Sequence, residues 1–139
     1  MQLTIPALPT DEDFEILKHG LNTYKESFTS ILPREKISSF IEDSSGTVFG
    51  GILGEIKWGW LYIEDLWIDA AIRNNDWGSK LLGTLEEYAR LKGVTSYRLE
   101  TTSFQTLGFY TKMGYTQFGE LLDYPPGHTS YFLKKQVAL

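Results

Sequence analysis

Hydrophobic residues near the N-terminus recur at the spacing of one face of a helix. Polar residues such as Lys18 and Asn22 fall on the opposite face, as expected for a helix that packs through one apolar stripe. Thr10 and the acidic residues that follow it supply an N-cap and a negative first turn. The pattern predicts a helix that starts after Thr10, and it allows a first strand from Leu3 to Ile5. The hydrophobic face consists of Phe14, Leu17, Leu21, Tyr24 and Phe28.

The segment that follows this helix has no single periodicity. Pro33 can open a short helix or a turn that continues to about Lys36. The stretch from Ile37 to Glu42 fits either a helix or the start of a strand. The sequence leaves these alternatives open.

Two strands joined as a hairpin are predicted in the middle of the chain. Ser44-Ser45-Gly46 supplies turn chemistry before the first strand, Thr47 to Leu53. Gly59 lies in the connection to the second strand, Trp60 to Ile68. Both strands are close to continuously apolar, which is typical of strands buried on both faces.

The second half of the chain alternates between helical and strand patterns. From Gly78 the hydrophobic period becomes helical, and Lys92-Gly93 ends the helix. The whole pattern predicts an α/β fold, in which helices cover a mixed sheet. No linker or repeat interrupts the sequence, so residues 1–139 are predicted to form one domain. The remaining predicted elements are strands at Tyr97 to Thr101, Tyr115 to Leu122 and Ser130 to Lys134, and a short helix from Thr106 to Lys112.

The composition excludes several classes of protein. The 139 residues contain no cysteine, so disulfides, thiolate metal sites and a cysteine nucleophile are excluded. The two histidines are far apart and give no metal-ligand spacing. No signal peptide or membrane span is recognisable, which predicts a cytoplasmic protein without a membrane partner. The net charge of −5 disfavours a nucleic-acid partner and suits a cationic substrate.

The strongest local feature is the polar turn between the strand that ends at Ile68 and the helix that starts near Gly78. Such a turn exposes backbone N–H groups at the positive end of a helix dipole, which is a ready anion site. Arg73, Ser79 and Lys80 add charge or hydroxyl donors around it. The alternative is an ordinary strand-to-helix connection in which Asp76 caps the helix.

Two motifs resemble those of the GCN5-related N-acetyltransferases (GNAT). They are R-x-x-x-x-G-S-K-L-L at Arg73 to Leu82 and G-F-Y-T-K-M-G-Y at Gly108 to Tyr115. The resemblance covers roughly Thr47 to Lys135. It implies a central sheet of about six or seven strands with helices on both faces, and acetyl-CoA as co-substrate. The cofactor-binding residues that it implies are Leu66, Trp67, Ile68, Arg73, Asn74, Asn75, Asp76, Trp77, Gly78, Ser79, Lys80, Phe109 and Tyr110.

One position departs from the family pattern. Asp76 stands where the first glycine of the family's pyrophosphate turn lies. Aspartate tolerates a left-handed backbone better than most residues, so the loop can still form. A carboxylate close to a pyrophosphate is repulsive, however. We therefore expect weaker cofactor binding than in the family, unless Asp76 turns outward to cap the helix.

Acetyl transfer to an amine needs a base, a polarised carbonyl and a proton donor for the departing thiolate. Tyr110 aligns with the family tyrosine and is the expected donor, although it can also be a core residue beside Phe109. The backbone N–H groups at 66–68 would polarise the carbonyl. Glu64 or Asp65 is the expected base, and at most one of these neighbours should point to the cleft. His128, in a Pro-Pro-Gly turn, is a further candidate base.

The residues and the resemblance together predict an acetyl-CoA-dependent N-acetyltransferase that acts on a small-molecule amine. Direct transfer in a ternary complex is predicted, since no cysteine can carry an acyl group. Trp58 and Trp60 could line the acceptor pocket. The alternative is a catalytically degenerate coenzyme A-binding or protein-interaction module on the same fold. Many family members of this size are dimers, so a homodimer is a further expectation.

Overall fold

The computed structural model describes residues 1–28, 34–102 and 104–139. The chain divides into a small N-terminal unit, residues 1–31, and a larger unit, residues 32–139, and each is described by itself. Among the described residues, no helix has the length and apolar character needed to cross a membrane. The elements are α1 (Asp11–Glu26), β1 (Glu35–Glu42), β2 (Val48–Lys57), β3 (Trp60–Ile68), a short 3-10 helix (Ala70–Ile72), α2 (Trp77–Leu91), β4 (Ser96–Thr101), α3 (Phe104–Lys112), β5 (Thr116–Leu122) and β6 (Thr129–Gln136).

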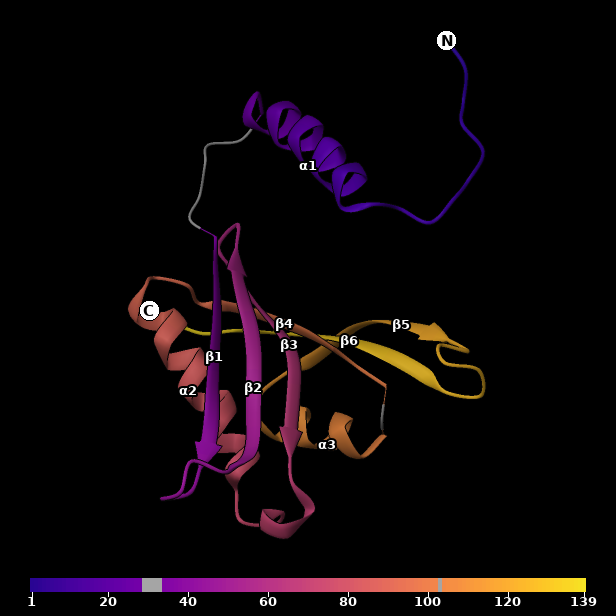
Figure 1. Ribbon diagram of the computed structural model, residues 1–139. Helices are drawn as coiled ribbons and strands as arrows, with labels where there is room; N and C mark the ends of the chain where they lie inside the picture. The colour runs from indigo at the N-terminus through magenta and orange to yellow at the C-terminus, as the bar shows by residue number, and fades with distance from the viewer. Residues whose placement is uncertain (29–33, 103) are drawn as a thin grey trace. The chain divides into compact units, whose positions relative to one another are not determined.

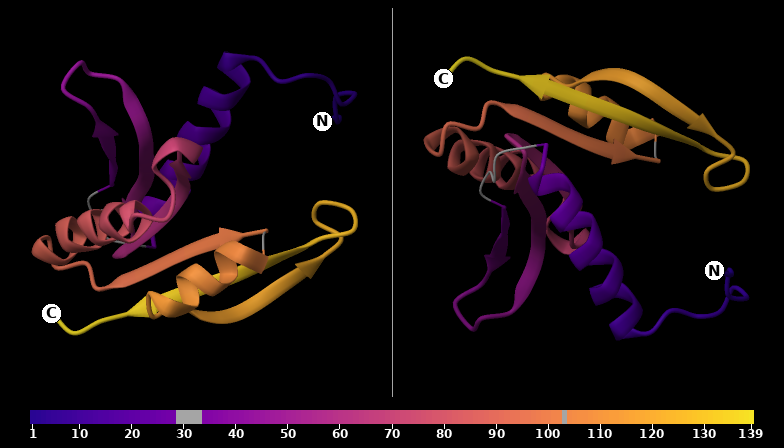
Figure 2. Two further views of the ribbon diagram at one scale, coloured as in Figure 1. Left: turned by 90° about the horizontal axis from the view of Figure 1, so that it is seen from below. Right: turned by 90° about the horizontal axis from the view of Figure 1, so that it is seen from above.

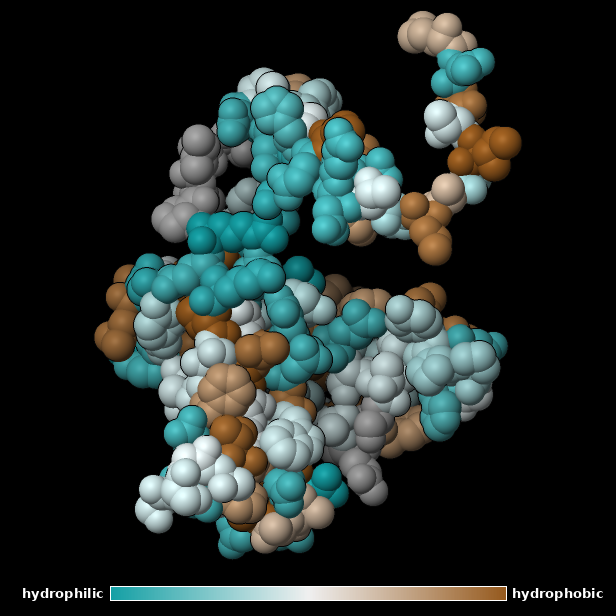
Figure 3. All heavy atoms as spheres, viewed as in Figure 1, coloured by the Kyte–Doolittle hydropathy of each residue, from teal (hydrophilic) through white to brown (hydrophobic). Residues whose placement is uncertain are grey.

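The N-terminal unit contains α1, whose predicted start is confirmed. The Thr10 hydroxyl accepts a hydrogen bond from the Asp13 N–H at 3.1 Å, and the Asp13 carboxylate accepts one from the Thr10 N–H at 2.7 Å. This reciprocal capping box satisfies two of the free donors at the helix start. The strand expected at Leu3 to Ile5 is wrong, because these residues have no strand partner and are exposed. Figure 3 shows hydrophobic side chains along this N-terminal segment.

The larger unit is built on a mixed sheet of six strands in the order β1-β2-β3-β4-β6-β5, which confirms the predicted fold class (Figure 1). β3 and β4 are parallel, and the other neighbours are antiparallel. The segment left open between helix and strand is strand β1, so a helix or turn through Lys36 is wrong there. Its residues are alternately half-buried and exposed and pair along the whole of β2. Pro33 lies outside the described residues.

The core lies between the sheet and α2. Leu81, Leu82, Leu85 and Ala89 of this helix are at most 4% exposed and pack against strand residues such as Leu61. Full burial of each leucine contributes about 1.5–3 kcal/mol. The hairpin strands β2 and β3 alternate between buried and more exposed positions along most of their length, so the prediction that both faces are buried is wrong. The sequence of these strands looks continuously apolar because some apolar residues, such as Trp67, lie on the more exposed face; Trp67 is 51% exposed.

Helix α3 lies on the same side of the sheet as α2. A Cβ atom at Gly78 in α2 would meet the Phe109 ring of α3 at 3.4 Å, and both helices contribute to one buried cluster. Figure 2 shows the two halves of the sheet, β1–β3 and β4–β6–β5, turning away from each other. The two halves are therefore joined mainly through α2 and the short β3–β4 pairing.

A buried ion pair ties α2 to the second half of the sheet. Lys135 of β6 donates to both carboxylate oxygens of Glu86 in α2, at 2.9 and 3.0 Å. The Tyr97 hydroxyl donates to the Glu86 carbonyl at 3.2 Å. Burial raises the pKa of the Glu86 carboxyl, and the Lys135 ammonium opposes this shift. Removing either partner would leave an uncompensated charge in the interior.

Two glycine-to-alanine changes should have opposite effects on stability. At Gly54 of β2, a Cβ would lie 3.0 Å from the Tyr62 carbonyl oxygen and 3.1 Å from a Leu85 methyl, so these neighbours must shift by a few tenths of an ångström. We expect Gly54→Ala to lower the free energy of unfolding by about 1–3 kcal/mol, the usual cost of overpacking. Gly83, inside α2, has open space around it. Gly83→Ala should raise that free energy by about 0.5–1 kcal/mol. Urea unfolding measures both, and equal effects would contradict this packing.

Candidate active site

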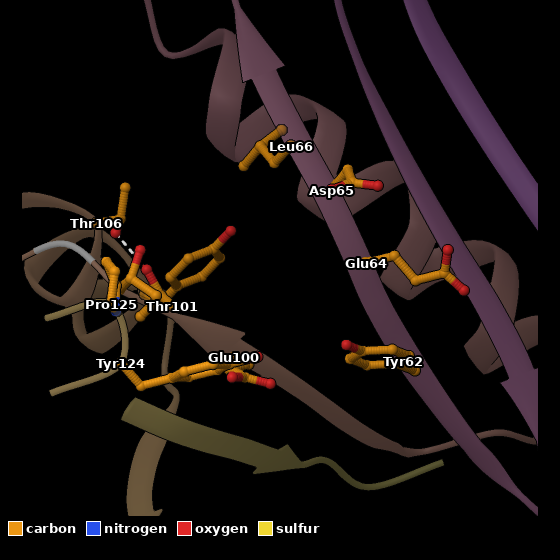
Figure 4. Close-up of a pocket in the computed structure, with 11 residues that line it drawn as sticks. Tyr62, Glu64, Asp65, Leu66, Glu100, Thr101, Thr106, Tyr124 and Pro125 are labelled. Carbon is orange, nitrogen blue, oxygen red and sulfur yellow. Dashed lines mark hydrogen bonds between the residues drawn. The ribbon is translucent and has the colours of Figure 1, made fainter. Parts of the chain in front are cut away.

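A β-bulge in β3 places two carboxylates on one face of the sheet. Ile63 pairs with Gly54 and Asp65 pairs with Leu53, so Glu64 is an extra residue without a partner in β2. The bulge reverses the alternation: Ile63 faces the core before it and Leu66 packs against the core after it. Glu64 and Asp65 therefore share the face opposite to α2 (Figure 4). The expectation that only one of these neighbours faces the cleft is wrong, because it assumed regular alternation.

Strands β3 and β4 part immediately before this bulge. Their parallel pairing runs from Trp60 and Ser96 to Ile63 and Leu99 and then stops, although β3 continues to Ile68 and β4 to Thr101. The edge of β3 that faces β4 is thus unpaired over its last residues. An opening is formed between two strands in the middle of the sheet.

The unpaired edge of β3 presents backbone donors to this opening. The Asp69 N–H donates to the Phe49 carbonyl at 2.7 Å, which makes these residues a hydrogen-bonded pair between β3 and β2. Such pairs alternate along antiparallel strands, so Trp67 also directs its backbone groups to β2. Leu66 and Ile68 direct theirs toward the opening. The N–H of Leu66 is therefore placed to donate to an oxygen that enters between the strands.

A cleft of about 620 Å³ occupies the opening. Tyr110, Thr101 and Thr106 come from the side of the sheet covered by α3, and the two threonine hydroxyls hydrogen-bond to each other (Figure 4). Leu66 points to the opposite side of β3 from Glu64 and Asp65. The cleft therefore has walls from both faces of the sheet. Its complete lining is Tyr62, Glu64, Asp65, Leu66, Glu100, Thr101, Thr102, Thr106, Tyr110, Tyr124 and Pro125.

Tyr110 belongs both to the core and to the cleft wall. Its side chain is 7% exposed and makes edge-to-face contacts with Phe109 and Tyr115, at centroid distances of 5.0 and 5.7 Å. The two predictions for Tyr110, a core residue beside Phe109 and a proton donor in the cleft, are thus compatible. Burial raises the pKa of Tyr110 to about 12. The hydroxyl stays protonated at neutral pH and can act as a hydrogen-bond or proton donor.

Several residues that line the cleft were not among the site residues predicted from the sequence. Glu100 and Thr101 end β4, Tyr62 precedes the bulge, and Tyr124 with Pro125 comes from the β5–β6 loop. Glu100 follows the alternation of β4, in which Tyr97 and Leu99 are buried and Arg98 and Glu100 are exposed. An exposed acidic residue on a strand is an ordinary feature of sequences. Only the register, which ends one residue earlier, marks Glu100 as part of a cleft.

The turn before α2 exposes a row of backbone donors. Asn74 and Asp76 have positive φ angles of 66° and 61°, and the Asp76 side chain makes no capping hydrogen bond. The alternative in which Asp76 caps the helix with its side chain is therefore wrong. The first N–H with an intrahelical acceptor belongs to Lys80, which donates to the Asp76 carbonyl at 3.1 Å. Within the described residues, the N–H groups of 77–79 have no acceptor, as expected at the anion-binding end of a helix.

The side chains of the turn mostly brace it. The Arg73 Nε donates to the Ile68 carbonyl at 3.1 Å, and the Asn75 amide donates to the Arg73 carbonyl at 3.2 Å. The Ser79 hydroxyl donates to the Asp76 carbonyl at 2.8 Å, and the Lys80 ammonium lies 4.6 Å from the centre of the Trp77 ring. An anion at this turn would therefore be held chiefly by backbone N–H groups and by Lys80.

Other predicted site residues lie elsewhere. His128 is exposed in the β5–β6 loop, where its N–H donates to the Pro125 carbonyl at 2.9 Å, and it does not line the cleft. Trp58 and Trp60 line a second groove of about 440 Å³ that meets the cleft at Tyr62. Phe109 packs over Gly78 at the start of α2.

A family model for the acetyltransferase (GNAT) family matches residues 7–115. The chain belongs to this family. The protein is therefore an acetyl-CoA-dependent N-acetyltransferase. Among the described residues, no three His, Cys, Asp or Glu side chains are close enough together to hold a metal ion.

Known proteins similar to this GNAT chain include enzymes and solved structures. A blasticidin-S acetyltransferase from Streptomyces morookaense is 37% identical over 76% of this chain and 78% of that protein. A crystal structure of an acetyltransferase from Bacillus cereus is 31% identical, with a TM-score of 0.87 over 96% of this chain and 98% of that one. A Bacillus anthracis structure in complex with acetyl coenzyme A shares the fold, at 20% identity and a TM-score of 0.67 over 83% of this chain and 68% of that one.

Asp76 should limit coenzyme A affinity through its charge and not through its backbone. Its left-handed conformation is the one that the family glycine would supply, so the turn is formed. We expect Asp76→Gly and Asp76→Asn to tighten coenzyme A binding by about fivefold at low salt, since one repulsive unit charge contributes about 1 kcal/mol in water. Isothermal titration calorimetry measures the effect.

Asp76→Ala provides the matched control. It also removes the charge, but alanine in the left-handed region costs about 1–2 kcal/mol, so thermal stability should fall. Unchanged affinity in the Gly and Asn variants would contradict a carboxylate close to the pyrophosphate.

Proposed function

We propose that this protein transfers the acetyl group of acetyl-CoA directly to the amine of a small molecule bound between β3 and β4. The observation that supports this proposal most directly is the end of the β3–β4 pairing at Ile63 and Leu99. It leaves an opening where the Leu66 backbone, the Tyr110 hydroxyl and two carboxylates of β3 meet. With no cysteine in the sequence, no thiol is present to carry the acetyl group in a two-step route.

The two faces of the sheet suit the two substrates. The donor-rich start of α2 lies on the helix-covered side, beside Phe109 of α3, and fits a pyrophosphate. Glu64 and Asp65 line the cleft from the opposite face of the sheet and fit a cationic amine. The acetyl donor and the amine would thus approach each other from opposite sides of the sheet. Bound acetyl-CoA supplies an activated acetyl thioester.

Each proton in the transfer has a group in the cleft. Glu64 or Asp65 takes the proton of the substrate ammonium, directly or through water, and leaves a neutral nitrogen. The nitrogen–carbon bond forms as the carbon–sulfur bond breaks, and the Leu66 N–H stabilises the charge on the carbonyl oxygen. As the bond forms, the nitrogen loses its second proton to water in the cleft, and Tyr110 donates its proton to the departing thiolate. The proton taken up by the water then restores the Tyr110 hydroxyl.

A thermal-shift titration with acetyl-CoA tests the first half of this proposal. A ligand that binds only the folded state raises stability by about 2.7 kcal/mol at a hundred times its dissociation constant. We expect a saturable rise of the melting temperature, followed by release of free thiol when a suitable amine is added. The amines to be tested should include blasticidin S, because one relative of this chain is a blasticidin-S acetyltransferase. A shift without thiol release for any amine would instead favour the coenzyme A-binding module. Absence of a shift would contradict both the acetyltransferase and the coenzyme A-binding module.

Tyr110→Phe should lower kcat by at least about tenfold with little change in the KM for acetyl-CoA, because the ring keeps its packing and only the proton donor is lost. Since the pKa of Tyr110 is raised to about 12, this group should cause no loss of wild-type activity up to about pH 10. Steady-state kinetics against pH measure both effects.

Tyr115→Phe is the control, because Tyr115 is equally buried, at 2% exposed, and touches the Tyr110 ring but does not line the cleft. Its kcat should remain within about twofold of the wild type. Equal losses in the two variants would point to disturbed packing and would contradict a proton-donor role for Tyr110.

A further inference from the structure

The cleft between β3 and β4 is lined by carboxylates on both of its walls. Glu64 and Asp65 come from β3, and Glu100 comes from β4 across the opening. None of the described residues that line the cleft is basic. Within the described part of the chain, none of these three carboxylates takes part in an ion pair. The cleft therefore holds more negative charge than the removal of one proton requires.

The basic residues nearby are directed to a different groove. Arg98 lies over the Tyr62 ring, 4.1 Å from its centre, and lines the second groove together with Lys57 and Lys134. Tyr62 lines both cavities. The charged side chains are acidic in the cleft on one side of this ring and basic in the groove on the other. Burial, followed by the charge of Glu100, raises the pKa of Tyr62. Tyr62 is thus a neutral wall between an anionic cleft and a cationic groove.

A second, independent feature shows that the carboxylates face a ligand site. The Tyr110 side chain is 7% exposed and lines the same cleft, and its hydroxyl has no hydrogen-bond partner among the described residues. The hydroxyl at the end of this buried ring is therefore available to hydrogen-bond a ligand in the cleft. Beside it, the unpaired edge of β3 directs the Leu66 N–H into the opening. The acidic walls therefore surround the place where the acetyl group would be transferred.

We propose that the acceptor is an organic amine with a second positive charge, and that Glu100 selects it by binding that second charge. This inference rests on the proposed function. Glu64 and Asp65 are then free to remove a proton from the amine that reacts, while Glu100 keeps the other ammonium ionised and fixed on the opposite wall. The volume of about 620 Å³ is within the range of small-molecule sites.

The proton and bond balance is unchanged by the second charge. One ammonium loses a proton to a β3 carboxylate, and its nitrogen bonds the acetyl carbon as the carbon–sulfur bond breaks. The nitrogen then loses its second proton through water to Tyr110, which has protonated the thiolate. The second ammonium stays protonated throughout. The product is a monoacetylated cation with one charge fewer than the substrate, so its attraction to the acidic cleft is weaker and its release is favoured.

The test compares 1,4-diaminobutane with butylamine, which has the same carbon chain and one charge. Thiol release at saturating acetyl-CoA should give a kcat/KM at least about tenfold higher for the diamine, mainly through a lower KM. Glu100→Gln should lower kcat/KM for the diamine by about tenfold and change that for butylamine by less than about twofold. Equal values for the two amines in the wild type, or an equal loss for both in Glu100→Gln, would overturn the proposal.

Glu120→Gln is the matched control. Glu120 lies on β5, is exposed and does not line the cleft, and its replacement changes the net charge of the chain by the same amount. Its kinetics with both amines should equal those of the wild type. If Glu120→Gln also removed the preference for the diamine, selection would come from the overall charge and the role of Glu100 would be refuted.

Calorimetry separates failure of this inference from failure of the acetyltransferase proposal. Titration of 1,4-diaminobutane into the coenzyme A-bound protein should show saturable binding that Glu100→Gln weakens by about tenfold, with no need for turnover. Absence of saturable binding, together with an intact acetyl-CoA thermal shift, would overturn the dication inference alone. Absence of the acetyl-CoA shift would instead overturn the proposed function.

Discussion

The parting of β3 from β4 is the constraint on which the rest of the site depends. The two strands are held together over only a short parallel register, and the bulge at Glu64 follows at once. In a fully paired sheet, the Leu66 and Ile68 backbone groups would be used by the neighbouring strand. Here the N–H groups of Leu66 and Ile68 are left available at an opening inside the sheet.

The opening survives because other contacts keep the two halves of the sheet in place. Helix α2 packs on the first half through its leucines and is tied to β6 by the ion pair between Glu86 and Lys135. Helix α3 contacts α2 at Gly78 and brings Tyr110 to the wall of the cleft. The sheet can therefore give up pairing at its centre, because α2 and α3 replace the missing ladder as the connection between its halves.

Electrostatics divide the site into two regions of opposite character. The start of α2 presents free N–H groups at the positive end of the helix dipole, whereas the opposite face of β3 and β4 carries Glu64, Asp65 and Glu100. An anionic cofactor and a cationic amine are each favoured on one side. The Asp76 carboxylate weakens this division at one position, although its left-handed backbone preserves the turn.

The sequence by itself determined most of the elements and pointed to the turn before α2 as an anion site. Capping residues, hydrophobic periods and glycines fix local structure, so α1, α2 and β3 were predicted close to their observed bounds, although β2 continues to Lys57 beyond its predicted end at Leu53. The motifs around Gly78 and Tyr110 pointed to the family, which the comparisons confirm. These signals act between residues that are near one another in the chain.

Only the tertiary structure decided how the cleft is made. A bulge is one extra residue in one strand relative to another, so its presence at Glu64 cannot be seen without the partner strand. The same holds for Glu100, an ordinary exposed acidic residue until the end of the β3–β4 register places it opposite Glu64 and Asp65. Strand register is a long-range property set by packing, and it is register that joins the carboxylates, the free N–H groups and Tyr110 into one site.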